Sequence, residues 1–251
     1  MPGRHAAEFK LSITKALSDQ LAAALQYLSP APMTLANIRA LSARAGVYQL
    51  YLGDVLVYIG KADRSLPQRL EMHHRKIAGR AGISITDMSF TCLYVEEDFS
   101  AVAPERLLIS RHRSLGEIPW NGNGFGNNDP GKNRDKTQLD ADHFDRLYPI
   151  DLSWTLDLPG GSMTLEELLS WLARELPYRF RYQGSQAFSQ IIIRLPARPC
   201  VDEVLALISS SLPAEWQITA LPGRLITYPN HDEYPDSLRS YRGGRIVSPG
   251  Q

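Results

Sequence analysis

The sequence predicts an α+β protein, in which a small antiparallel sheet flanked by helices is followed by a second small α+β domain. Two strand-like runs, residues 46–52 and 55–60, enclose the dipeptide Gly53-Asp54, and glycine tolerates the positive φ that tight hairpin turns need. Pro149 disfavours helix at the residue before it and marks a boundary. We therefore predict domains at residues 1–150 and 151–230, and a polar, flexible tail at 231–251.

Composition places the protein among ordinary globular proteins without a global preference for nucleic acid. Lys+Arg and Asp+Glu both total 27, and the hydrophobic content of 43% is enough for a sizeable core. Any attraction to DNA must therefore come from local patches. The sequence has no signal peptide and no apolar run of about 18 residues, so we expect a cytoplasmic protein without a membrane segment. In that compartment Cys92 and Cys200 are expected to be reduced core thiols.

Helices are predicted on both sides of the hairpin. An amphipathic pattern over residues 11–28, a Pro-rich break and a short helix lead into it. The helix after it is expected over residues 65–79, because Ser65 and Gln68 have the spacing of a capping box and Gly79 is a natural stop. Its apolar face is predicted to contain Leu66, Leu70 and Ile77, and its other face Arg69, Met72, His73 and Lys76.

The segment from Lys61 to Arg80 is predicted to form a cationic surface. It contains six Lys or Arg residues, two histidines and two acids, and it follows the two tyrosines of the hairpin. Such a surface is suited to a phosphodiester backbone. Two further motifs follow it. Pro104 opens a helix with Glu105 in its first turn, and Trp120-Asn121 precedes a Gly-rich stretch beginning at Gly124.

Together these motifs resemble the GIY-YIG nuclease superfamily. The two tripeptides are Gly46-Val47-Tyr48, with valine in place of the usual isoleucine, and Tyr58-Ile59-Gly60. The Trp-Asn pair and the Gly-Phe-Gly-Asn and Asp-Pro-Gly segments after Glu105 resemble one branch, the Type II restriction endonucleases with this fold. The resemblance covers about residues 8–150.

The resemblance implies an endodeoxyribonuclease whose catalytic residues are Tyr48, Tyr58, Lys61, Arg69, His73, Glu105 and Asn121. Glu105 is the implied single ligand of Mg²⁺, for which Mn²⁺ can substitute, and a hard cation that keeps most of its waters needs only one or two carboxylates. The implied role of Arg69 is to contact the scissile phosphate. One of the two tyrosines is expected to orient and deprotonate water, with its own proton drawn toward His73 or Lys61. An ordinary phenol is a poor base at neutral pH, so cationic neighbours are expected to lower the pKa of this tyrosine. The sequence does not choose between Tyr48 and Tyr58.

The C-terminal domain carries no catalytic constellation that the sequence reveals. Its predicted order is a strand at 153–158, a helix at 164–176, strands at 178–182 and 190–195, a helix at 200–212, and a hairpin formed by 216–219 and 224–228. This order resembles the short N-terminal domain of secretins and TonB-dependent receptors, which implies a fold and an interaction role. The domain has its own apolar helices and strands, so we expect it to fold independently. No stretch of it matches the cationic Lys61–Arg80 segment, so we expect it to mediate protein association.

Three interpretations of the whole chain remain open at this point. The first is a sequence-specific restriction enzyme that cuts double-stranded DNA as a homodimer, because two-fold symmetric subunits suit a palindromic site. The second is a nuclease of a mobile element or defence system whose residues 151–230 dock a partner protein. The third is a non-catalytic DNA-binding or docking protein, in which Tyr48 and Tyr58 are core residues, Asn121 is a turn residue and Glu105 only favours a helix start.

Overall fold

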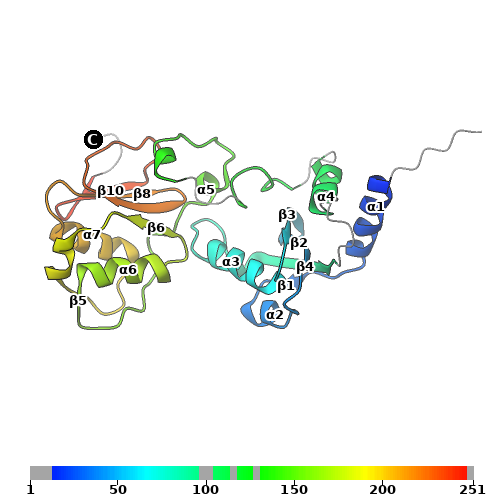
Figure 1. Cartoon of the computed structure of the whole chain (residues 1–251), viewed down its shortest axis with the longest axis horizontal. Helices are drawn as coiled ribbons and strands as arrows, with labels where there is room; N and C mark the ends of the chain where they lie inside the picture. The colour runs from blue at the N-terminus through cyan, green and yellow to red at the C-terminus, as the bar shows by residue number, and fades with distance from the viewer. Residues whose placement is uncertain (1–12, 96–103, 114–117, 127–130, 248–251) are drawn as a thin grey trace, which may run out of the picture. The chain divides into compact units, whose positions relative to one another are not determined.

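The computed structural model describes residues 13–95, 104–113, 118–126 and 131–247. The chain forms two compact units (Figure 1), the first from residues 1–71 and 86–121 and the second from residues 72–85 and 122–251. Both units combine helices with small sheets, which confirms the predicted α+β class. Within the described parts of the chain, no helix has the length and apolar character needed to cross a membrane.

The first unit is built around an antiparallel sheet with the strand order β1-β4-β2-β3. Its strands are β1 (Ala31–Pro32), β2 (Gly46–Leu52), β3 (Val55–Ala62) and β4 (Met88–Tyr94), the last preceded by the 3₁₀ turn η1 (Ile85–Asp87). β2 and β3 form the predicted hairpin, whose turn contains Gly53 at φ 55°. In this register Tyr48 lies opposite Gly60, and β3 is an edge strand.

Two helices of the first unit cover one face of this sheet. The helices of the unit are α1 (Ile13–Gln26), α2 (Leu35–Arg39) and α4 (Pro104–Arg113). α1 packs against α4, and α4 packs on β3, with Leu108 in one core with Val47 and Ile59. Because successive strand residues point to opposite faces, Tyr48 and Tyr58 lie on the face of the sheet away from α4.

Helix α3 (Leu66–Ala78) begins in the first unit and ends in the second. The Gln68 backbone N–H donates to Ser65 Oγ at 3.4 Å, which is one half of the predicted capping box. The helix ends directly before Gly79, as predicted. The predicted apolar residues, Leu66, Leu70 and Ile77, are fully buried.

The second unit has a five-stranded sheet with the order β11-β10-β8-β9-β6, in which only the β6–β9 pair is parallel. The strands of that sheet are β6 (Arg179–Tyr182), β8 (Gln217–Leu221), β9 (Arg224–Tyr228), β10 (Arg239–Arg242) and β11 (Arg245–Val247). A separate antiparallel pair is formed by β5 (Ser162–Thr164) and β7 (Ile192–Arg194). The helical elements of the second unit are η2 (Lys132–Arg134), α5 (Phe144–Leu147), α6 (Leu165–Glu175), η3 (Gln186–Gln190) and α7 (Val201–Ser211). α6 and α7 bury their leucine-rich sides against one face of this sheet in a continuous core.

The division of the chain differs from the boundary predicted near residue 150. Ile150 is buried in the core of the second unit, and its N–H donates to the carbonyl of Pro222 at 2.8 Å. Residues 122–149 belong to the same unit. Pro149 follows the end of α5, but it ends a helix and not a domain, because the chain around it is hydrogen-bonded to the C-terminal sheet.

Two local predictions for the C-terminal region are corrected by the structure. Residues 239–247 form β10 and β11 rather than part of a flexible tail, because Tyr241 is fully buried in the core and β10 pairs with β8. The strand expected at 153–158 is reduced to a single bridge between Thr155 and Cys200. The ladder cannot extend there, because α7 begins at the next residue. The other predicted helices and strands of this region are present.

Both cysteines have free thiols, as expected, and burial raises the pKa of Cys92 to about 12. Each is partly rather than fully buried. The Cys92 thiol, with its raised pKa, is poorly suited to act as a thiolate at neutral pH.

Candidate functional site

Tyr48 and Tyr58 lie together on the face of the first sheet away from α4. Their ring centroids are 6.1 Å apart and the rings are tilted by 40°. Tyr48 is completely buried, whereas 8% of Tyr58 is exposed. The Tyr48 phenol lies over Gly60, and a Cβ at that position would collide with it. The glycine of the second tripeptide therefore makes room for the tyrosine of the first.

Arg69 completes this group from the first half of α3. Its Nε donates a hydrogen bond to Tyr48 Oη at 3.2 Å. The guanidinium is about half-buried, so it combines a permanent charge with access to solvent. The structure thus brings together three of the predicted site residues in the first unit: Tyr48, Tyr58 and Arg69.

Burial raises the pKa of Tyr48 well above the ordinary value for a phenol. The neighbouring Tyr58 adds to the increase, and the charge of Arg69 opposes it without reversing it. Tyr48 is therefore a neutral hydroxyl at physiological pH, in contrast with the expectation that cationic neighbours lower its pKa. The physical reason is that the desolvation of a fully buried phenolate outweighs one partly exposed guanidinium.

Glu105 lies in the first turn of α4, as predicted. Its Oε2 atom is buried and has no hydrogen-bond partner among the residues that the structure describes. A buried carboxylate oxygen without a donor is costly unless a cation or water compensates it. The described residues contain no group of three or more His, Cys, Asp or Glu side chains able to hold a metal. A single carboxylate nevertheless suits Mg²⁺, which keeps most of its own waters.

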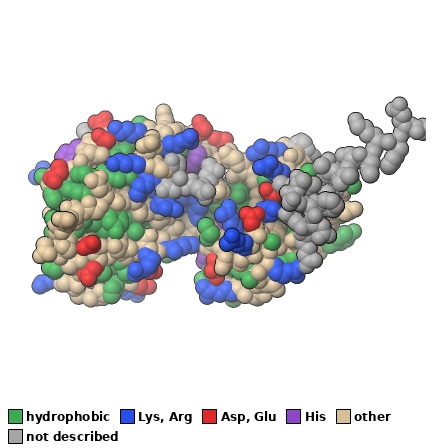
Figure 2. Space-filling view, in the orientation of Figure 1, with side chains coloured by type: hydrophobic (Ala, Val, Ile, Leu, Met, Phe, Trp, Pro, Cys, Tyr) green, Lys and Arg blue, Asp and Glu red, His purple; other side chains and the backbone are tan. Residues whose placement is uncertain are grey.

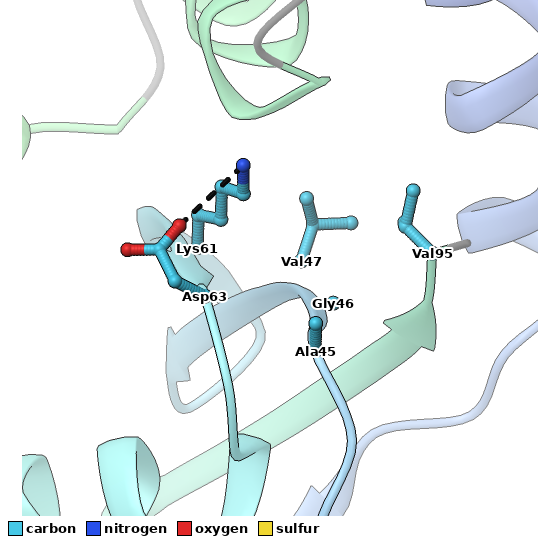
Figure 3. Close-up of a pocket in the computed structure, with 6 residues that line it drawn as sticks. All are labelled: Ala45, Gly46, Val47, Lys61, Asp63 and Val95. Atoms are coloured by element: carbon cyan, nitrogen blue, oxygen red, sulfur yellow. Dashed lines mark ion pairs between the residues drawn. The ribbon is translucent and has the colours of Figure 1, made fainter. Parts of the chain in front are cut away.

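Lys61 lies on the opposite face of the sheet from the two tyrosines. It is directly opposite Val47 in the hairpin register, and Val47 packs in the core with α4. Its Nζ forms an ion pair with Asp63 at 3.5 Å (Figure 3). The two residues line a shallow pocket of about 250 Å³ that contains neither tyrosine. The expected transfer of a tyrosine proton toward Lys61 therefore has no geometric support, since strand alternation separates the two side chains.

His73 is one helical turn after Arg69 on α3, but it lies in the part of the helix that belongs to the second unit. It is buried, with 4% of its surface exposed, rather than part of an open cationic surface. Its ring stacks on Phe125 with a centroid distance of 4.7 Å, and Phe125 packs edge-on against Phe144. Lys76 Nζ donates to the carbonyl of Phe125 at 2.6 Å.

Arg80 is a second correction to the predicted cationic surface. Its side chain is 3% exposed and pairs with Asp145 at 2.9 Å. Burial lowers the pKa of Arg80, while Asp145 acts in the opposite direction. Arg80 therefore joins segments of the second unit instead of facing a ligand.

Asn121 holds the edge of the tyrosine-bearing hairpin. Its Oδ1 accepts from the Ile59 N–H at 2.8 Å, and its Nδ2 donates to the Ile59 carbonyl at 2.8 Å. The adjacent Trp120 N–H donates to the carbonyl of Val57 at 3.0 Å. The amide thus replaces a missing neighbouring strand beside β3. Its contact with the backbone of the residue after Tyr58 was not foreseen from the sequence.

Phe125 is the other residue of this region that the sequence left without a role. The Gly-Phe-Gly segment drew attention to the loop, and the structure shows its phenylalanine as the stacking partner of His73. Gly124 adopts φ 90°, and a Cβ there would collide with the ring of His143. The small residue before Phe125 therefore lets the loop pass close to His143. Residues 127–130, the middle of this motif, lie outside the described residues.

Comparison with known protein families finds a match over nearly half of the chain. A family model described as the Eco29kI GIY-YIG domain matches residues 53–170. The matched region contains Tyr58, Lys61, Arg69, His73, Glu105 and Asn121, and it begins just after Tyr48. It also extends beyond residue 150, where the resemblance in the sequence was expected to end. A search of curated proteins finds no match.

Proposed function

We propose, on the premise that residues 53–170 belong to the Eco29kI GIY-YIG domain family, that the chain is a Mg²⁺-dependent endonuclease of double-stranded DNA. The family match supports a nuclease in the broad sense. The observation that carries the finer proposal is the group formed by Tyr58, Tyr48 and the hydrogen-bonded Arg69. Glu105, on α4, is added to this site by motif order, and its buried Oε2 has no hydrogen-bond partner among the described residues.

The proposed reaction is hydrolysis of a phosphodiester bond by in-line attack of water. Arg69 binds the scissile phosphate and stabilises the negative charge that grows on its oxygens. The hydrogen bond from Arg69 Nε to Tyr48 fixes the plane of the guanidinium, so its remaining N–H groups approach the phosphate in one orientation. Tyr48 is thus a positioning residue for Arg69.

Tyr58 is the better candidate to orient and deprotonate the attacking water. Tyr58 lies on the same face of the sheet as Tyr48 and retains some exposure to solvent. Tyr48 is fully buried, and its pKa is raised. A phenol that must lose a proton needs a route for water and a nearby positive charge. Tyr58 satisfies the first condition and lies beside the Tyr48–Arg69 pair.

The chemistry of Glu105 fits a divalent cation. When bound, Mg²⁺ neutralises charge on the phosphate and the leaving oxygen, and Mn²⁺ can take the same place. Glu105 would hold it through the buried oxygen that lacks a donor. This carboxylate lies in the first turn of α4.

We further propose that the enzyme is a sequence-specific restriction endonuclease that acts as a homodimer in the cytoplasm. The family to which residues 53–170 belong is named for a restriction enzyme, and two-fold symmetric subunits cut a palindromic site most simply. The test is to incubate the chain with mixed-sequence plasmid and Mg²⁺ and to sequence the ends. Ends that share a recognition sequence support restriction, whereas scattered ends leave only a general nuclease and uncut plasmid contradicts both.

The metal assignment predicts that Glu105→Ala abolishes cleavage while DNA affinity stays within about twofold of the parent, because the carboxylate acts through the metal. Glu166→Ala is the matched control, since Glu166 is an exposed glutamate in the first turn of α6. Cleavage of labelled duplex and binding in EDTA measure the two properties. Near-normal cutting by Glu105→Ala would rule out Glu105 as the metal ligand.

A further inference from the structure

The second unit carries a cluster of cationic side chains on the face of its sheet opposite α6 and α7. Strand alternation produces this placement: Phe180 and Leu225 point into the core, so their neighbours point outward. The segment that contains η2 crosses this face. The cluster consists of Lys132, Arg134, Asp135, Arg179, Arg181 and Arg224, and we refer to it as the Asp135 cluster.

Asp135 organises the cluster from its centre. Its carboxylate is 2% exposed and accepts from Arg181 Nη1 at 3.0 Å and 2.8 Å, and from Arg224 Nε at 2.8 Å. Tyr228 Oη donates to the same carboxylate at 3.3 Å. A buried carboxylate with these partners is fully compensated and lies beneath the two guanidinium groups. The carboxylate is therefore shielded from solvent, and the Arg181 and Arg224 side chains keep 20% and 13% of their surface exposed.

Three further cations extend the cluster outward. Lys132 Nζ lies 4.4 Å from the centre of the Tyr228 ring, and the Arg134 carbonyl accepts from Arg224 Nη2 at 3.3 Å. Arg179 is the direct strand partner of Arg224. The side chains of Lys132, Arg134 and Arg179 are all exposed. Figure 2 shows Lys and Arg side chains spread over the surface among acidic ones, in agreement with the zero net charge of the whole chain.

We propose that the Asp135 cluster binds the phosphate backbone of double-stranded DNA. Five cationic groups surround one buried carboxylate. Arg181 and Arg224 satisfy that carboxylate, and the exposed Lys132, Arg134 and Arg179 are open to phosphate oxygens. The proposal rests on the proposed nuclease function for the choice of polyanion. It replaces the expectation that this domain only mediates protein association. The sequence did not reveal the cluster, because its residues come from segments that are far apart in the chain.

The test compares two triple variants that remove equal charge. The first is Lys132→Gln, Arg134→Gln and Arg179→Gln, which leaves the buried Asp135–Arg181–Arg224 contacts intact. The control is Arg174→Gln, Arg194→Gln and Arg198→Gln, which changes three exposed arginines elsewhere in the same unit. Affinity for a mixed-sequence duplex of about 40 base pairs is measured in EDTA over a range of salt concentrations. Circular dichroism confirms that both variants are folded.

We expect the first variant to bind about 10–100-fold more weakly at moderate salt, with a slope of log K against log[salt] smaller by up to about three. The control should stay within about twofold of the parent. Equal binding by the two variants would overturn the proposal, as would a parent chain that binds poly-glutamate through the cluster but not duplex DNA.

Failure of the nuclease assignment gives a different result from failure of this proposal. A parent that binds duplex through the cluster but never cuts it, with Mg²⁺ or Mn²⁺, contradicts the proposed function and leaves the cluster assignment standing. A parent that cuts DNA normally and loses no affinity in the first variant contradicts the cluster alone. In an active enzyme the first variant should raise KM with little change in kcat, because the cluster takes no part in bond cleavage.

Discussion

At Tyr48, burial and hydrogen bonding act on the phenol in opposite directions. Complete enclosure raises its pKa, and the adjacent Arg69 opposes the increase. Burial is the larger effect, so Tyr48 keeps its proton and offers a neutral hydroxyl to the guanidinium. The two tyrosines of the motif therefore differ in what they can do, although the sequence presents them as equivalent.

This difference leads to a prediction about pH dependence. A base whose pKa lies above the assay range is deprotonated in a fraction that rises tenfold per pH unit, so a Tyr48 base would give a log-rate slope of about one from pH 6 to 9. We expect Tyr48→Phe to lose about tenfold in rate, through looser positioning of Arg69, and to keep the pH profile of the parent. Tyr58→Phe should lose on the order of 10²-fold or more. Single-turnover cleavage with Mg²⁺ at several pH values measures the rates of both variants. If the cleavage rate becomes independent of pH in Tyr48→Phe and not in Tyr58→Phe, Tyr48 is the base.

Arg69 permits a test of fork geometry against charge. Arg69→Lys keeps the positive charge but loses the planar guanidinium and the Nε contact with Tyr48. We expect a loss of cleavage on the order of 10²-fold or more, because a point charge cannot reproduce a bidentate phosphate contact. Arg64→Lys, at an exposed position before α3, is the control and should cleave normally. Full activity in Arg69→Lys would reduce Arg69 to a source of general electrostatic attraction.

At the scale of elements, the edge strand β3 depends on a side chain for its outer hydrogen bonds. Asn121 pairs with both the N–H and the carbonyl of Ile59, and Ile59 follows Tyr58 directly. The Asn121 amide makes the hydrogen bonds that a neighbouring strand would make, because an amide supplies both a donor and an acceptor. The asparagine of the motif can therefore influence the site through the backbone that carries Tyr58.

Replacement of Asn121 should affect both stability and activity. Asn121→Ala leaves two backbone groups of β3 without partners, so we expect the free energy of unfolding to fall by about 1–3 kcal/mol. Asn121→Asp retains the acceptor and loses the donor, and should be intermediate. The control is Asn123→Ala, whose amide makes only contacts of 3.4 Å and 3.3 Å to Asp142. Urea unfolding and cleavage rates are measured for each; normal stability in Asn121→Ala would show that the edge contact is dispensable.

At the scale of the whole molecule, α3 joins the two units. The part of the helix that carries Arg69 belongs to the first unit, and the part that carries His73 belongs to the second. Contacts inside the second unit hold that half: Arg75 Nη2 donates to the carbonyl of Leu176 at 2.7 Å, and Arg80 Nη1 donates to that of Pro222 at 3.0 Å. A Cβ at Gly79 would collide with Pro177. The C-terminal region therefore holds the half of α3 that carries His73.

This support changes the expected effect of truncation. The sequence alone favours an active fragment ending at Ile150, but that cut removes most of the core to which Ile150 belongs, together with the carbonyls that Arg75 and Arg80 contact. We expect the fragment 1–150 to be partly unfolded and to lose most cleavage. A chain ending at residue 247 keeps every described strand and should behave as the full chain.

Circular dichroism, mass in solution and cleavage of labelled duplex decide between these outcomes. A folded and active 1–150 fragment would show that the C-terminal region is dispensable for α3. A folded fragment that self-associates like the full chain but loses affinity for DNA would instead favour a pure DNA-binding role for the removed region.

Features that depend on local pattern follow from the amino-acid sequence alone. The Gly53 turn and the two β-rich runs specified the hairpin, and Ser65 and Gly79 marked the ends of α3, because caps and turns act over a few residues. The helix start at Pro104 placed Glu105 in a first turn for the same reason. Motif order was enough to indicate the resemblance to the GIY-YIG nucleases, because residue identities and their spacing can be read without a structure.

Which of these residues lie close together depends on packing between distant segments of the chain. Strand register put Lys61 on the face opposite Tyr48, and packing buried His73 against Phe125 and Arg80 against Asp145. Burial of Ile150 and Tyr241 likewise moved the domain boundary and turned the expected tail into strands. Each of these outcomes depends on contacts between segments distant in the chain, and desolvation, which sets the pKa of Tyr48, arises only when those segments enclose it.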